Sequence, residues 1–131
     1  MEIILKNKEL APAINFLQSL NLKAADSRHR SKLVKLLVNA FEEFGQEEKE
    51  LTKKFDLLDD NGELKKEKDR DLENVKLFNA GQQILANEEV IIDGGMYAKN
   101  IEEMPRILNE YDGEMSGKDA EIYDRLLDEM E

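Results

Sequence analysis

Residues 33–55 read Leu33-Val-Lys-Leu-Leu-Val-Asn-Ala-Phe-Glu-Glu-Phe-Gly-Gln-Glu-Glu-Lys-Glu-Leu-Thr-Lys-Lys-Phe55. Apolar side chains recur three, four and seven positions apart in this region, which places them on one face of a long helix. The near-heptad spacing indicates that this helix packs lengthwise against a second helix. Asp26 or Ser27 is expected to cap its start, and Gly45 is expected to permit a bend. The inward positions are Leu33, Leu37, Ala40, Phe41, Phe44, Leu51, Phe55 and Leu58.

The second helix of the pair is predicted over residues 71–87, after a charged connector at 56–71. Asn61-Gly62 in the connector favours a tight turn with positive φ. The side chains expected to face inward from the second helix are Leu72, Val75, Phe78 and Leu85. The simplest packing of two helices joined by such a connector is an antiparallel hairpin.

Two short β-branched runs, at residues 2–6 and 89–93, predict strands that pair as a minimal sheet. Shorter helices are expected from Leu10 to Leu20, with Pro12 tolerated in the first turn, and from about Asn100 to Tyr111. A last helix is expected to start at Ser116, whose spacing to Asp119 matches a relaxed capping box. Its inward residues would be Ala120, Tyr123, Leu126, Leu127 and Met130. The predicted fold is therefore mainly α (α+β), in a single domain spanning residues 1–131.

Composition narrows the class of protein. The chain has 131 residues, no Trp, five Phe and three Tyr, so its core must come mostly from Leu, Ile, Val and Met. The absence of cysteine excludes disulfides and thiolate metal sites. No apolar run reaches the roughly 18–20 residues of a membrane span, and the start at Glu2 lacks a basic secretory signal. These features predict a cytoplasmic protein without a membrane partner.

Charge is distributed unevenly along the chain. The net charge of −11 divides into +4 for residues 1–40 and −15 for residues 41–131, which disfavours direct nucleic-acid binding over most of the surface. A cluster of five basic residues lies at the start of the long helix. It could contact phosphate or an acidic partner, or could pair with the acidic helices of the chain itself. The acidic run could imitate a phosphate array or form a solvated helix face. The basic residues are Lys23, Arg28, Arg30, Lys32 and Lys35; the acidic ones are Glu42, Glu43, Glu47, Glu48 and Glu50.

No motif predicts a catalytic, cofactor-binding or metal-binding residue. If Gly62 held the sixth place of a calcium loop, Leu57 and Lys68 would stand where acidic ligands are required, so a plain turn is expected. His29 is the only histidine, and we interpret it as an exposed member of the basic cluster. Gly94-Gly95 lacks the spacing of a phosphate loop and is interpreted as a flexible turn.

Both ends of the sequence carry a recognisable pattern. The opening comprises Ile3-Ile-Leu-Lys-Asn-Lys-Glu-Leu-Ala-Pro-Ala-Ile-Asn-Phe-Leu17, Leu22-Lys23 and Ser27-Arg-His-Arg-Ser-Lys-Leu33. The closing stretch is Leu108-Asn-Glu-Tyr-Asp-Gly-Glu-Met-Ser-Gly-Lys-Asp-Ala-Glu-Ile-Tyr-Asp-Arg-Leu-Leu127. The pattern resembles a family of small proteins from phages and prophages of Gram-positive bacteria, a domain of unknown function. The resemblance implies a phage gene of the late region, near tail, baseplate and lysis genes, but no site residues.

Two functions of different classes follow as expectations. The first is a non-enzymatic protein that binds a phage structural protein, an accessory of tail or baseplate assembly that could associate with the virion. The second is an acidic inhibitor of a host defence nuclease, of the anti-CRISPR kind, that imitates nucleic acid. No cofactor is expected for either. The unlike charges of the two parts would also permit homo-oligomers.

Overall fold

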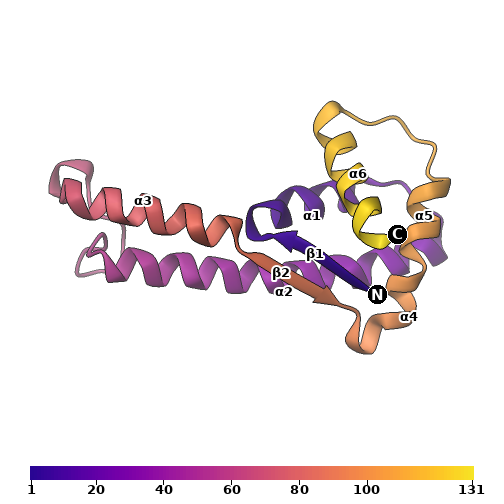
Figure 1. Ribbon diagram of the computed structural model, residues 1–131, viewed down its shortest axis with the longest axis horizontal. Helices are drawn as coiled ribbons and strands as arrows, with labels where there is room; N and C mark the ends of the chain where they lie inside the picture. Colours follow the sequence, from indigo (N-terminus) through magenta and orange to yellow (C-terminus); the bar gives the residue numbers. More distant parts are fainter.

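The structure is a computed structural model that describes residues 1–131, and it confirms the mainly α (α+β) fold (Figure 1). Three short 3-10 turns lie between the main elements, at Asn7–Glu9 (η1), Glu67–Asp69 (η2) and Gly95–Tyr97 (η3). The main elements in chain order are β1 (Glu2–Lys6), α1 (Leu10–Ser19), α2 (Ala24–Lys54), α3 (Leu72–Asn87), β2 (Glu89–Asp93), α4 (Ala98–Glu102), α5 (Met104–Glu110) and α6 (Gly117–Met130).

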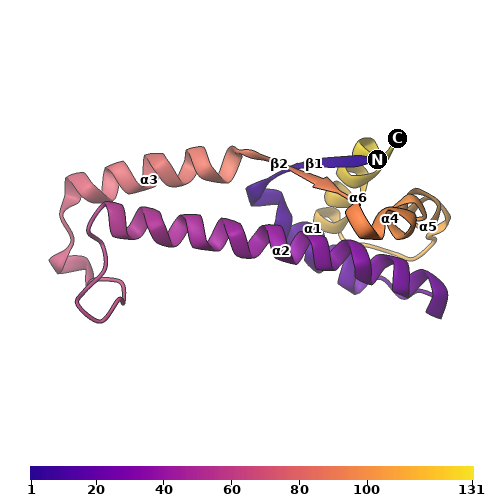
Figure 2. The same cartoon turned by 90° about the horizontal axis from the view of Figure 1, so that it is seen from below.

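Helices α2 and α3 form the predicted antiparallel hairpin, which projects from the rest of the molecule (Figures 1 and 2). Gly81 of α3 lies against the side chains of Leu51 and Phe55 at the end of α2. The Gln82 amide also donates a hydrogen bond of 2.8 Å to the Glu48 carboxylate. The α2 helix runs through Gly45 without interruption.

The two strands pair antiparallel at the base of the hairpin, with the predicted bounds 2–6 and 89–93. Their register sets Glu2 opposite Asp93, Ile4 opposite Ile91 and Lys6 opposite Glu89. Because side chains alternate between the faces of a strand, Ile3, Leu5 and Ile92 share the face that is buried in the core.

The hydrophobic core lies at the end of the molecule opposite to the hairpin tip. It joins the inner face of the sheet and α1 to the first half of α2, α4, α5 and α6. Phe16 of α1 packs edge-on to Tyr123 of α6, with ring centroids 6.0 Å apart. Outside this core, the buried apolar side chains are Phe44, Leu57 and Leu85. The distal hairpin therefore has little buried apolar area to stabilise it.

The predicted start of the second helix was wrong by about one turn. Helix α2 begins at Ala24, after Lys23, and neither Asp26 nor Ser27 caps it. Asp26 lies in the first turn, where a helix N-terminus favours a carboxylate. It accepts a hydrogen bond of 2.8 Å from Arg106 of α5. This bond lowers the pKa of Asp26. The hydrogen bonds that Arg106 donates to Asp26, the larger effect, and to Glu103 raise the pKa of Arg106.

Other expected turns and helix ends were confirmed. Gly62 has φ of 78°, and the carboxylate of Asp59 accepts hydrogen bonds from the backbone N–H groups of Asn61 and Glu63. The Ser116 hydroxyl accepts a hydrogen bond of 3.3 Å from the Asp119 N–H and so caps α6.

Several expected inward positions were wrong. Leu72 is 79% exposed because it starts α3 at the hairpin tip, where no second layer covers it. Phe41 is 40% exposed, and Ala120 lies on the outer side of α6, where Ile122 is buried instead. The helix expected over 100–111 is divided at Glu103 into α4 and α5, with Pro105 in the first turn of α5.

Candidate interaction surfaces

The five basic residues at the start of α2 have different environments. Arg30 is structural, since one of its Nη atoms donates to the carbonyl oxygens of Leu17 and Leu20, at 2.7 and 2.9 Å, at the end of α1. Lys23 and Arg28 are exposed, and Lys32 and Lys35 turn toward η3. None of the five forms an ion pair with the acidic helices, contrary to one of the two interpretations of this cluster.

Lys32 and Lys35 lie against the ring of Tyr97, with Nζ atoms 4.9 and 5.5 Å from its centroid. The Lys35 ammonium also donates a hydrogen bond of 3.1 Å to the Tyr97 hydroxyl. This hydrogen bond and the positive charge of Lys35 lower the pKa of Tyr97. Sequence reasoning missed Tyr97, because it lies 62 residues from Lys35 and no periodic pattern includes it.

Replacing Lys35 by Met is expected to raise the pKa of Tyr97, because the substitution removes both the hydrogen bond and the charge that favour the phenolate. The measurement is a pH titration of the Tyr97 Cζ resonance by NMR. Lys99→Met, an exposed lysine of α4, is the matched control and should leave the titration unchanged. Equal shifts in both variants would contradict the assignment.

His29 is half-buried rather than fully exposed. Its Nδ1 atom lies 3.1 Å from the Asn100 amide nitrogen, so it accepts a hydrogen bond when the ring is neutral and carries its proton on Nε2. The contact joins α2 to α4. The only histidine of the chain thus serves as a link between two helices.

The acidic residues of α2 lie beyond the core, on the hairpin. Glu42, Glu43, Glu47 and Glu50 are exposed, and the half-buried Glu48 accepts the hydrogen bond from Gln82. Glu43, Glu47 and Glu50 are spaced four and three residues apart, so they share one helix face. No lysine or arginine forms an ion pair with any of these five carboxylates.

Helix α3 carries an exposed apolar row, which we call the outer seam: Leu77, Ala80 and Ile84. Leu77 is 45% exposed and Ile84 is 68% exposed. Their spacing of three and four residues corresponds to the a and d positions of a heptad. Gln82, which contacts α2, lies on a different face of α3, and Gly81, which also contacts α2, lies at the border between that face and the outer seam.

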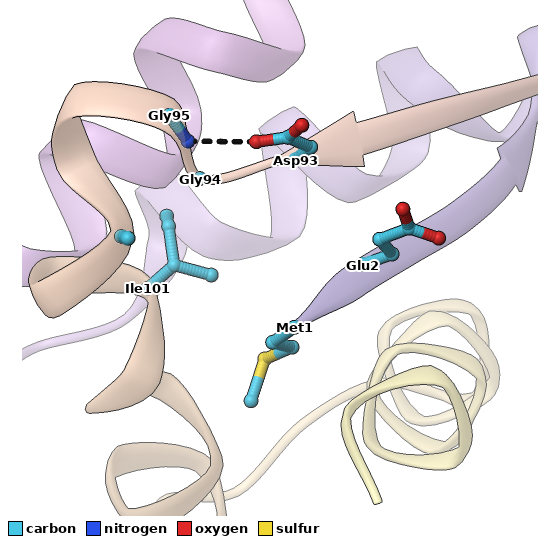
Figure 3. A pocket seen from close by; sticks show the side chains of 7 residues that line it. Met1, Glu2, Asp93, Gly94, Gly95 and Ile101 are labelled. Carbon is cyan, nitrogen blue, oxygen red and sulfur yellow. Dashed lines mark hydrogen bonds between the residues drawn. The ribbon is translucent and has the colours of Figure 1, made fainter.

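A small hollow lies beside the Gly94-Gly95 turn, between the start of β1 and α4 (Figure 3). The Asp93 carboxylate accepts a hydrogen bond of 2.8 Å from the Gly95 N–H, and Glu2 lines the same hollow. Two carboxylates at this position would repel an anionic ligand such as phosphate. The interpretation of Gly94-Gly95 as a turn is confirmed, with φ of 52° at Gly95.

The whole of this chain, residues 1–131, matches the model of a family described as "Protein of unknown function (DUF1617)". The chain belongs to this family. The expected membership in a family of unknown function is therefore confirmed. Neither the curated proteins nor the solved structures gave a match. No helix combines the length and the apolar character needed to cross a membrane.

Proposed function

We propose that this chain is a phage-encoded, non-enzymatic protein-binding protein that docks through the outer seam of α3. The observation that carries the proposal is the exposure of Leu77 and Ile84 on a hairpin that projects from the core. A partner helix can cover an a/d row of this kind, with its own apolar residues in the same spacing.

The apolar row as a whole, rather than any one of its residues, distinguishes this surface. Single exposed apolar side chains are normal, but a contiguous apolar surface is typical of interaction sites. Burying a Leu or Ile side chain in full stabilises a complex by about 1.5–3 kcal/mol. The side chains on the seam are already part-buried, so each would contribute less than that.

A role as an accessory of tail or baseplate assembly is supported by the residue pattern at the two ends of the chain. That pattern, from Ile3 to Leu33 and from Leu108 to Leu127, resembles phage and prophage proteins of Gram-positive bacteria. The resemblance implies a gene of the late region, near tail, baseplate and lysis genes. A phage structural protein is accordingly the proposed partner.

The alternative is an inhibitor that imitates nucleic acid in a host defence nuclease. The exposed row of Glu43, Glu47 and Glu50 favours it, since these carboxylates have no basic partner within the chain. Such a row can attract a basic channel over a distance, and its attraction falls as salt rises.

The test is an affinity pull-down of the tagged full-length chain from infected and uninfected host lysates. The assembly role predicts capture of tail or baseplate proteins, and the double variant Leu77→Ser/Ile84→Ser is expected to reduce that capture by about tenfold or more. The matched control is Lys76→Ser/Gln83→Ser, which changes two exposed residues with the same seven-residue spacing on the neighbouring face.

The outcomes separate the two functions. Capture of a host nuclease, in a complex weakened by salt and by added DNA, would replace the assembly role by inhibition. Equal capture by the two double variants would show that the partner binds elsewhere than the outer seam.

A further inference from the structure

The sheet has two strands, and its two outer edges differ in how they are covered. On the β1 side, the Ile4 N–H donates a hydrogen bond of 3.0 Å to the Glu129 carboxylate of α6. The Ile4 carbonyl accepts one of 2.9 Å from Arg125 of the same helix. Side chains of α6 therefore occupy the outer edge of β1.

These contacts also show which way the backbone N–H and C=O groups of β2 point. Because Ile4 turns its N–H and C=O groups away from β2, the pair Ile4 and Ile91 is a non-hydrogen-bonded pair of the antiparallel ladder. The N–H and C=O groups of Ile91 consequently point away from β1, as do those of Glu89 and Asp93, two positions on either side.

No element covers the outer edge of β2. Helix α2 passes across one face of the sheet, and the space beyond the outer edge holds neither strand nor helix (Figures 1 and 2). No backbone or side-chain hydrogen bond outside the sheet reaches the backbone of Ile91, whose side chain is 57% exposed. Unpaired strand edges of this kind are templates for another strand.

We infer that the outer edge of β2 binds an extended segment of a partner protein as a third strand. The segment has an apolar residue at its centre and a basic residue two positions away on either side. The main chain of the segment would exchange two hydrogen bonds with Ile91. Its apolar side chain would cover the exposed side chain of Ile91, and its basic side chains would lie opposite Glu89 and Asp93.

A second copy of this chain fits the edge poorly. Antiparallel pairing of two β2 strands about Ile91 would set Glu89 of each copy opposite Asp93 of the other. Like charges directly opposite one another destabilise a strand pair, and here both flanks would carry them. The two carboxylates select a basic segment instead.

The test uses the full-length chain and a synthetic peptide with the core Lys-Thr-Val-Thr-Lys, flanked by serines. Binding is followed by the backbone amide resonances of the protein. The expected result is a shift of the Ile91 amide on titration, together with slower hydrogen exchange at that amide. A peptide that is N-methylated at the central Val lacks one main-chain donor and is expected to bind about tenfold more weakly.

A charge exchange gives a second, independent readout. Glu89→Lys should weaken binding of the basic peptide and improve binding of a Glu-Thr-Val-Thr-Glu peptide. Glu88→Lys makes the same change in charge at an exposed residue just before the strand and should have a smaller effect. Equal affinities for the methylated and unmethylated peptides, or no binding at millimolar peptide, would overturn the inference. These results are independent of the outer seam of α3, which the peptide does not contact.

Discussion

Phe16→Ala is expected to lower the free energy of unfolding by about 4 kcal/mol, as substitutions of fully buried aromatic residues do. The Phe16 side chain is 1% exposed, and it packs against Tyr123 between α1 and α6. Its removal leaves a cavity that the surrounding helices cannot fill, and it removes the edge-on contact with Tyr123. Chemical denaturation of the purified variant, followed by circular dichroism, measures the change.

The matched control is Phe41→Ala, in α2 just beyond the residues that belong to the core. Phe41 is 40% exposed, and its aromatic contact is with Phe44, at 6.4 Å between ring centroids. Its loss is expected to cost about 1 kcal/mol, since much of its surface is already in contact with water. If the two variants lost equal stability, the core would have to extend into the hairpin, contrary to the burial pattern.

The sequence was sufficient for the elements whose signals are local. The strand bounds 2–6 and 89–93 follow from two β-branched runs, the second of which ends at Asp93-Gly94-Gly95. The hairpin follows from two helical periods separated by a turn at Asn61-Gly62. In each case the pattern and the turn residues agree, so no tertiary contact is needed to decide between alternatives.

The sequence was insufficient where burial depends on what covers a helix. Phe41 and Leu72 continue apolar periods of their helices, yet both are exposed. Helices α1, α4 and α5 and strand β2 pack against α2 at its core end, whereas its distal half packs only against α3 (Figures 1 and 2). Periodicity states which side of a helix is apolar, but it does not state how many layers lie on that side.

The candidate surfaces likewise divide into features that the sequence shows and features that depend on contacts between distant residues. The basic and acidic residues of α2 were visible as runs of charge, and most of them are exposed. The contact of Lys35 with Tyr97 and the free edge of β2 were not visible, because both depend on pairings between distant residues. The edge in particular follows from Ile4, whose backbone is bound by α6 at the opposite end of the chain.

Gly94→Ala is expected to cost about 3 kcal/mol, at the upper end of the usual range for overpacking in a filled site. The reason is space rather than backbone freedom, since Gly94 has φ of −62° and ψ of −33°, which any residue can adopt. A Cβ atom there would lie 2.6 Å from the Cα atom of Ala98. A backbone atom cannot turn aside as a flexible side chain can, so the start of α4 would have to move away from the end of β2.

Gly95→Ala is the matched control one residue later, and it isolates the other property of glycine. Gly95 has φ of 52°, but a Cβ atom there would meet nothing within 4 Å. The only expected cost is then that of an alanine in the left-handed backbone region, about 1 kcal/mol. Thermal unfolding should therefore show a much larger decrease in Tm for Gly94→Ala than for Gly95→Ala. The reverse order would mean that α4 yields easily at Ala98, and that the junction between β2 and α4 is held by the conformation of the turn instead of by close packing.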